Sequence, residues 1–92
     1  MYVTTASRLT IQSGQLTIGT TAQQLSDRSV PPLSQGVTIT AATGNAGVIY
    51  VGGEQPAYVL EPGQSVTIPT TDMRLVYVAA SEVDQSLSYI GY

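Results

Sequence analysis

The chain has 92 residues, a formal net charge of −3, only 10% charged side chains, and neither histidine nor cysteine. This length predicts one domain, and the missing residue types exclude Ser-His-Asp and Cys-His catalysis, His/Cys metal centres and CxxC redox pairs. The basic residues are three scattered arginines with no lysine, so neither nucleic acid nor an anionic membrane is an expected partner.

The N-terminal part alternates apolar and polar residues with a period of two. Residues 8–12 and 15–18 both follow this pattern, which predicts strands with aliphatic side chains on one face and polar side chains on the other. Ser13-Gly14 lies between them and predicts a turn. Residues 1–14 are therefore expected to form an arm or an edge strand within a single domain spanning residues 1–92.

The longest stretch without a periodic pattern is residues 22–35. Its adjacent prolines, Pro31 and Pro32, favour an extended backbone, so it is interpreted as a long irregular connection. Alternation resumes at 37–41. The runs 48–51 and 75–78 are apolar on both faces, which is typical of strands in the middle of a sandwich or covered by a partner.

The C-terminal part repeats the strand-and-turn pattern. Residues 58–60 form a third run that is apolar on both faces, and residues 66–68 alternate. Pro62-Gly63 between them predicts a type II turn, because proline suits the first central position and glycine the second. Residues 87–90 predict a closing strand. Short strands with Gly/Pro punctuation and no helical period predict an all-β fold, a small antiparallel β-sandwich or jelly-roll-like barrel.

No pattern of residues predicts a catalytic, cofactor-binding or metal site. Two carboxylates can in principle hydrolyse a glycoside, but the closest pair, Glu82 and Asp84, lies in a polar stretch that we interpret as a solvated loop. A calcium site at Asp72 or Asp84 has no supporting ligand spacing. We therefore expect a protein that binds rather than an enzyme, with no cofactor.

All six aromatic residues are tyrosines, and tyrosine suits both protein interfaces and sugar-stacking surfaces. Tyr50 and Tyr77 lie in the most apolar runs and are expected in the core. The chain ends and the proline-containing connection are the expected contact surface. The candidate partner contacts are Tyr2, Val30, Pro31, Pro32, Leu33, Tyr89 and Tyr92.

Three short segments carry a family resemblance. They are Thr21-Ala22-Gln23-Gln24-Leu25 before an aliphatic strand, Tyr50-Val51-Gly52-Gly53, and the turn Pro62-Gly63-Gln64-Ser65. With the strands around them, over roughly residues 15–91, the sequence resembles the small β-rich virion proteins of tailed bacteriophages, in particular capsid decoration (cement) proteins. The likeness is one of sequence style, and it transfers no functional residue.

The resemblance implies a sandwich or jelly-roll-like module bound at symmetry points of an icosahedral shell. The expected partner is the major capsid protein or another virion protein, with homo-oligomerisation, a trimer favoured. The expected location is the virion, after synthesis in the host cytoplasm without a signal peptide. The alternatives are a tail, neck or fibre module that recognises a host glycan or another virion protein, and a small enzyme using the carboxylates.

Overall fold

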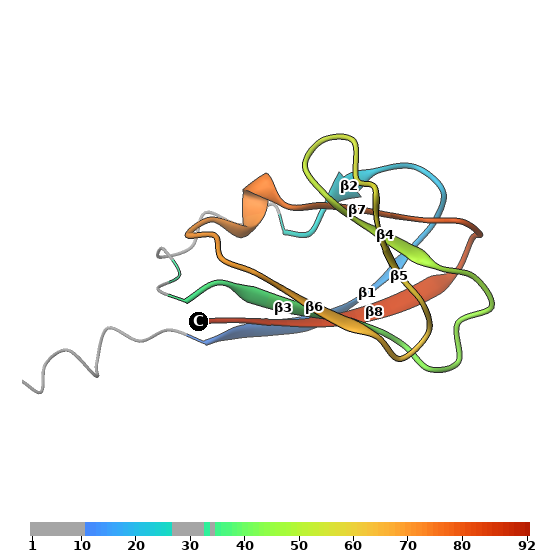
Figure 1. Cartoon of the computed structure of the whole chain (residues 1–92), viewed down its shortest axis with the longest axis horizontal. Coiled ribbons are helices and arrows are strands. Elements are labelled where there is room, and N and C mark those ends of the chain that lie inside the picture. The colour runs from blue at the N-terminus through green and yellow to red at the C-terminus, as the bar shows by residue number, and fades with distance from the viewer. Residues whose placement is uncertain (1–10, 27–32, 34) are drawn as a thin grey trace, which may run out of the picture.

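The computed structural model describes residues 11–26, 33 and 35–92 and contains two antiparallel sheets packed face to face (Figure 1). Sheet A has the strand order β1-β8-β3-β6, and sheet B has the order β2-β7-β4-β5. The strands of sheet A are β1 (Gln12–Ile18), β8 (Gln85–Gly91), β3 (Val37–Ala41) and β6 (Ser65–Ile68). Those of sheet B are β2 (Gln23–Gln24), β7 (Tyr77–Ala80), β4 (Ile49–Gly52) and β5 (Tyr58–Leu60). The predicted all-β sandwich is confirmed.

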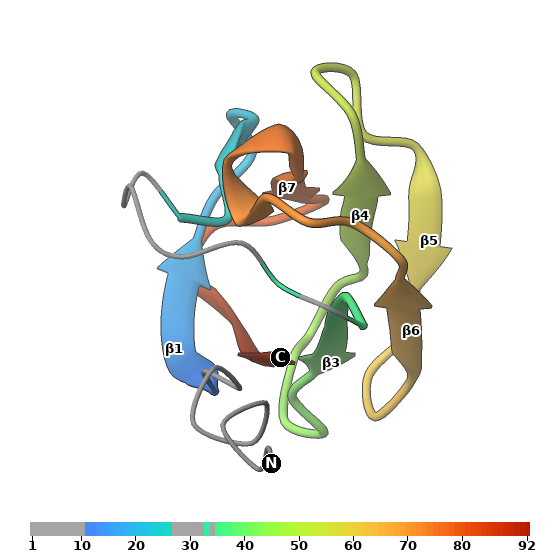
Figure 2. The same cartoon turned by 90° about the vertical axis from the view of Figure 1, so that its left-hand side faces the viewer.

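The strand pairing is that of a long hairpin rolled up on itself. β1 pairs with β8, β2 with β7, β3 with β6, and β4 with β5, all antiparallel. Two further pairs, β3 with β8 and β4 with β7, close the two sheets. Every connection between successive strands crosses from one sheet to the other, except the one from β4 to β5 (Figure 2). This is the jelly-roll arrangement that viral capsid domains and many lectins share.

The core forms because each strand sends alternate side chains between the sheets. Val37, Ile39 and Ala41 of β3 are almost fully buried, while Thr38 and Thr40 between them face outward. The same alternation buries Ile49 and Val51 of β4. The other core side chains are those of Ile18, Leu25, Leu33, Leu60, Met73, Val76, Val78, Ala80 and Leu87. Period-two patterning is therefore sufficient to divide the two faces of these strands.

Ser13-Gly14 is not a turn, because β1 runs straight through both residues. Gly14 lies opposite Tyr89 of β8, and a Cβ added at Gly14 would be 2.8 Å from the Tyr89 hydroxyl oxygen. The glycine thus leaves room for an aromatic ring on the inner face of the sheet, a use of glycine inside strands that resembles a turn in sequence. Residues 12–14 belong to β1, which lies at an edge of sheet A.

Four other predictions need correction. Tyr50 and Tyr77 are half-buried and lie on the outer face of sheet B, because the residues beside them, Ile49, Val51 and Val78, take the inner positions.

The run 75–78 does not form one strand: the 3-10 turn η2 (Met73–Leu75) precedes β7, and Leu75 is exposed. The run 58–60 forms β5, an edge strand and not a central one. Within 22–35, β2 interrupts the expected irregular connection.

The predicted type II turn at Pro62-Gly63 is confirmed. The Gln64 amide donates to the Glu61 carbonyl at 2.9 Å, and Gly63 has a φ of +86°. A positive φ at this position is the reason that glycine is needed there.

Candidate functional surface

The outer face of sheet A is polar and uncharged. Its outward positions carry hydroxyl or amide side chains: Ser13, Gln15, Thr17, Thr38, Thr40, Ser65, Thr67, Ser86 and Ser88. Two cross-strand pairs are bonded to each other, Thr38 to Thr67 at 2.8 Å and Thr40 to Ser65 at 2.7 Å between hydroxyl oxygens. We call this surface the hydroxyl face. Without charge, it costs less to desolvate against a partner than a charged surface would.

One end of the hydroxyl face is apolar. Ile90 of β8 is 42% exposed, Tyr92 just after β8 is 43% exposed, and Ile11 just before β1 is 67% exposed. The register pairs Gln12 with Gly91, which brings Ile11 beside Tyr92. These three residues form what we call the apolar corner. Exposed apolar side chains that gather at one place are typical of a contact surface.

Tyr92 is held firmly by its backbone. Its amide donates to the Gly36 carbonyl at 3.0 Å, and its carbonyl accepts from the Gln35 and Gly36 amides at 2.7 and 3.1 Å. The ring therefore projects from a backbone position that is hydrogen-bonded on both its amide and its carbonyl. Ordering this residue before a partner arrives lowers the entropic cost of binding through it.

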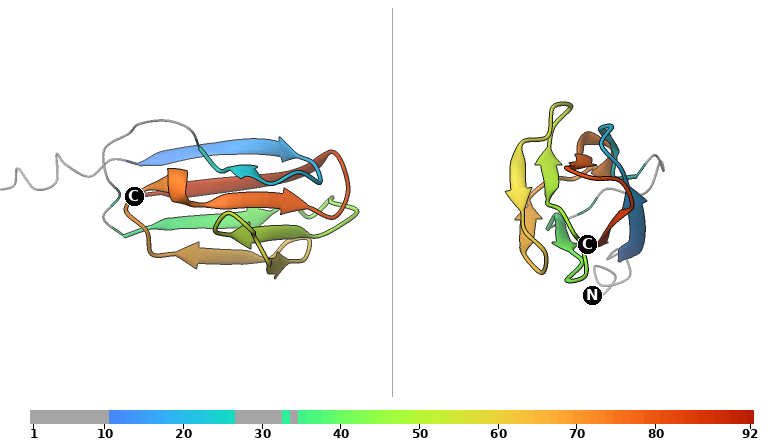
Figure 3. Two further views of the ribbon diagram at one scale, coloured as in Figure 1. Left: turned by 90° about the horizontal axis from the view of Figure 1, so that it is seen from above. Right: turned by 90° about the vertical axis from the view of Figure 1, so that its right-hand side faces the viewer.

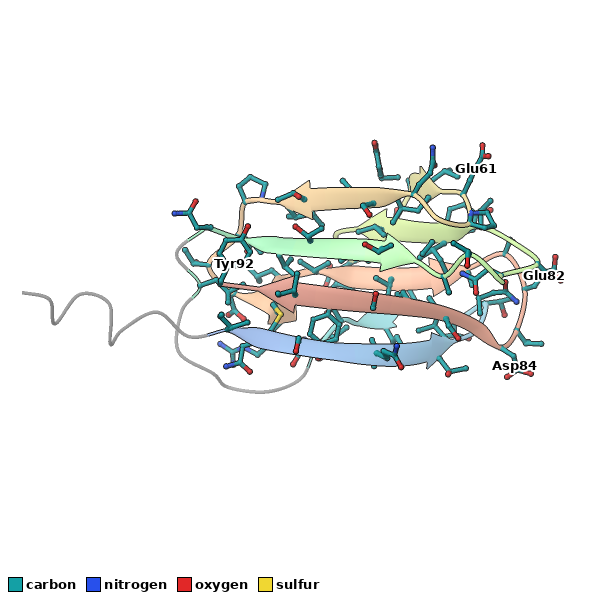
Figure 4. The ribbon with its side chains drawn as sticks, turned by 90° about the horizontal axis from the view of Figure 1, so that it is seen from below. Glu61, Glu82, Asp84 and Tyr92 are labelled. Atoms are coloured by element: carbon teal, nitrogen blue, oxygen red, sulfur yellow. The ribbon has the colours of Figure 1, made fainter. Side chains whose placement is uncertain are left out.

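Three acidic side chains lie at the opposite end of the sandwich, while Glu54 and the Asp72–Arg74 pair lie elsewhere. Glu61, Glu82 and Asp84 lie at the end far from Tyr92, as Figure 4 shows for the face of sheet A. All three are exposed. The described part of the molecule thus has an acidic end and an apolar corner, joined by the uncharged hydroxyl face. Such a distribution favours one orientation against a partner surface.

A second surface lies where the edges of the two sheets face each other at β5 and β6. A hollow of about 440 Å³ opens there. Its rim includes Tyr58 and Leu75, which are 60% and 65% exposed. The lining residues are Val51, Gly52, Gly53, Tyr58, Val66, Ile68, Thr70, Leu75 and Val76. We call it the apolar hollow; it has the size of a pocket for one large side chain or a small ligand.

Next to it lies a polar hollow of about 470 Å³, which shares Gly53 and Leu75 with the apolar hollow. Gln24, Glu54, Asp72, Arg74 and Tyr77 complete its lining. The two hollows are therefore adjacent: one is apolar, and the other carries carboxylate, guanidinium and amide groups.

Asp72 and Arg74 form an ion pair in the lining of the polar hollow. One carboxylate oxygen of Asp72 accepts a hydrogen bond from the Arg74 amide at 2.9 Å. The carboxylate also accepts hydrogen bonds from Nε and Nη2 of the Arg74 side chain. These hydrogen bonds lower the pKa of Asp72 below its usual value and raise the pKa of Arg74. Asp72 thereby caps η2, the 3-10 turn between β6 and β7 that ends at the exposed Leu75.

The predicted contact residues have different fates. Tyr2, Val30, Pro31 and Pro32 lie outside the described residues. Tyr92 is exposed at the apolar corner, as a contact residue has to be. Tyr89 is half-buried and packs against the core, with its ring over Gly14.

Leu33 is a core residue and offers no contact surface. Its side chain is 3% exposed, and its amide donates to the Thr71 carbonyl at 2.9 Å. Its methyl groups lie against Gly91. Apolar content alone did not separate this residue from a surface contact. Ile11, Ile90, Tyr58 and Leu75 were missed as exposed residues because each stands in an apolar run or an alternating pattern, which predicts burial.

Among the described residues, no three acidic side chains come together in a way that would hold a metal ion. In the same part of the chain there is no helix with the length and hydropathy needed to span a bilayer. No protein-family model, curated protein or solved structure matches the chain.

Proposed function

We propose that this protein is a non-enzymatic structural component of a bacteriophage particle, a capsid decoration protein that binds the lattice of the major capsid protein and stabilises the head. The observation that carries the proposal is the uncharged hydroxyl face ending in the apolar corner, with Tyr92 fixed by its backbone. The jelly-roll topology supports this role by analogy, since viral capsid domains use it.

The proposed docking mode follows from the charge distribution. The apolar corner and the adjoining hydroxyl face contact the shell, and the acidic end with Glu61, Glu82 and Asp84 faces solvent (Figure 4). A contact of this kind is weak for one copy. Many copies on one lattice, organised as a homo-oligomer with a trimer favoured, raise the effective concentration and compensate for the weakness.

The first test is the copy number in particles purified from the phage whose genome encodes the chain. Quantitative mass spectrometry against the major capsid protein measures it. A simple fraction of the capsid protein supports decoration of the whole lattice. A few copies per particle would place the protein at a tail, neck or unique vertex, and no copies would refute the virion role.

The second test addresses the docking surface with point variants. Each variant is added to purified particles that lack the protein, and the bound fraction is measured. Tyr92→Ala and Ile90→Thr are expected to bind less than wild type, while the thermal midpoint of each variant stays within a few degrees. Val83→Thr is the matched control, because Val83 is 65% exposed and next to Glu82 and Asp84 at the acidic end. Equal loss in all three variants would contradict the docking mode. Deleting residues 89–92 would not serve, because it would cut β8 between β1 and β3.

A second candidate is supported by the polar hollow. Tyr77, Gln24, Glu54 and the Asp72–Arg74 pair line one depression, and an aromatic ring beside carboxylate and amide groups is the combination that sugar-binding surfaces use. The alternative is therefore a glycan-binding module of a tail or fibre. A glycan array with wild type and Tyr77→Ala tests it: binding that Tyr77→Ala removes would favour the tail or fibre role over decoration.

A further inference from the structure

The outer edge of β1 lacks the usual protection against pairing with another strand. Among the described strands, the sheet edges are β1 with seven residues, β6 with four, β5 with three and β2 with two. Shortness protects an edge, since it leaves few unpaired backbone groups. β1 is the long exception, and it runs along one side of sheet A (Figure 3, left).

The other protective devices are missing from β1 as well. Residues 12–18 contain no charged side chain and no proline. The register with β8 runs without interruption from Gln12↔Gly91 to Ile18↔Gln85, so no bulge twists the edge away. Within the described part of the chain, β8 is the strand that pairs with β1 and no strand covers its other side. An edge of this kind is a template for a further strand.

We propose that β1 pairs antiparallel with β1 of a second copy of this chain, centred on Gln15, so that sheet A continues across a two-fold axis. Centring on Gln15 pairs Ser13 with Thr17 of the other copy and Gln15 with itself. The hydroxyl face then continues across the axis without any like-charge contact, which is the usual obstacle to self-pairing.

The inner side of the edge fits the same register. Centring on Gln15 sets Leu16 of one copy opposite Gly14 of the other, a large side chain against a residue without one. Leu16 is half-buried and borders a groove of about 340 Å³ between the edges of β1 and β2. The groove, lined also by Gln23, Gln24 and Leu25, leaves room for inward side chains of an added strand. A one-residue slip would turn the polar side chains inward, so the alternation favours this register.

The contact is small, so it is expected to be weak in solution. A seven-residue strand is about 24 Å long. One added strand buries less than the roughly 1,200 Å² that stable interfaces reach. The inference deepens the proposed function by naming a self-contact: joined in pairs, trimers would be linked to their neighbours on a lattice. The test of this self-contact uses the isolated chain, so failure of the self-contact can be distinguished from failure of particle binding.

Single cysteines test the register directly, because the chain has none of its own. Gln15→Cys at high concentration in a glutathione redox buffer is expected to form a disulfide-linked dimer. An equal mixture of Ser13→Cys and Thr17→Cys is expected to cross-link more than either variant alone. Thr40→Cys is the matched control, because Thr40 lies on the same face but on β3, inside the sheet. Circular dichroism checks that each variant is folded.

Three results would overturn the inference. In the first, Gln15→Cys cross-links no more than Thr40→Cys, which would mean that the edge is covered or unused. In the second, Gln15→Cys links to Ser65→Cys and not to itself, which would mean that β1 pairs with the β6 edge. In the third, Ser13→Cys or Thr17→Cys alone links best, which would contradict the register.

A measurement of non-covalent self-association tests the same register. Gln15→Lys and Gln15→Glu are each expected to weaken self-association several-fold in sedimentation equilibrium, because identical charges face each other across the axis. Mixing the two variants is expected to restore association, since the charges then attract. Without restoration, Gln15 does not face itself and the proposal fails.

Discussion

Replacing Gly36 with alanine is expected to destabilise the fold strongly. Gly36 has a φ of +126°, a region that side chains rarely adopt, and an added Cβ would collide with the carbonyl oxygen of Ile68. The Cβ would also be 2.9 Å from Cα of Pro69, so backbone and not a flexible side chain has to move. The strained conformation alone costs on the order of 1–3 kcal/mol.

The displacement adds to this cost because Gly36 holds the chain end. Its amide and carbonyl both bond to Tyr92, at 3.1 and 3.0 Å. We therefore expect a loss of about 3 kcal/mol, which corresponds to a fall in thermal midpoint of roughly 12–24 °C for a domain of this size. Urea unfolding followed by circular dichroism measures the change in unfolding free energy.

Gly44→Ala is the matched control for this experiment. Gly44 lies in a turn, its φ is not positive, and an added Cβ meets no atom within 4 Å. Its unfolding free energy is expected to stay within about 1 kcal/mol of wild type, with a gain possible through the unfolded state. If Gly36→Ala unfolds at the same urea concentration as Gly44→Ala, the account of Gly36 is wrong.

Three further predictions concern the core, a buried amide and an ion pair. Ile39→Ala, at a fully buried position, is expected to cost about 2–5 kcal/mol, whereas Ile11→Ala stays within about 0.5 kcal/mol by the same urea assay. Gln85→Leu is expected to cost about 1–3 kcal/mol, since it leaves the Gly47 amide and the Val83 carbonyl without the partners now at 2.9 and 2.8 Å; a neutral result would mean that water replaces them. Asp72→Asn is expected to lower the thermal midpoint near neutral pH but not in acid: the folded pKa of Asp72 is lowered, so its contribution is present above the unfolded value of about 3.9 and is lost as the pH falls through the folded value. An effect of Asp72→Asn that persists at low pH would show that the amide itself disturbs the cap.

The sequence was sufficient to predict which side chains are buried where a strand has one solvent-exposed face and one buried face. Thr38 and Thr40 alternate with buried residues in β3, and the alternation shows which side faces the core. It was insufficient where an edge or a gap breaks this rule. Tyr58 and Leu75 stand in apolar runs, which predicts burial. They are nevertheless exposed at the rim of the apolar hollow, which opens between the sheet edges at β5 and β6.

The candidate surface was only partly predictable for a related reason. Tyr92 was expected as a contact because it is an aromatic residue near a chain end, but its fixation by Gly36 depends on a pairing that spans most of the chain. Local patterns carry no information about which distant strands meet. The apolar corner is likewise made of residues from opposite ends of the sequence, Ile11 and Ile90, and it exists only through the β1–β8 register.

The rolled hairpin also sets how this protein can fold in a cell. Gln12 pairs with Gly91, and β8 lies between β1 and β3, so sheet A cannot form until nearly the whole chain has been synthesised. Until then β1 has strand-forming residues but no partner strand. Contacts this distant in sequence favour folding in milliseconds to seconds. During that interval both edges of the long uncharged strand are open to neighbouring chains, whereas in the folded protein β8 covers one of them, so rapid synthesis of many copies adds an aggregation risk.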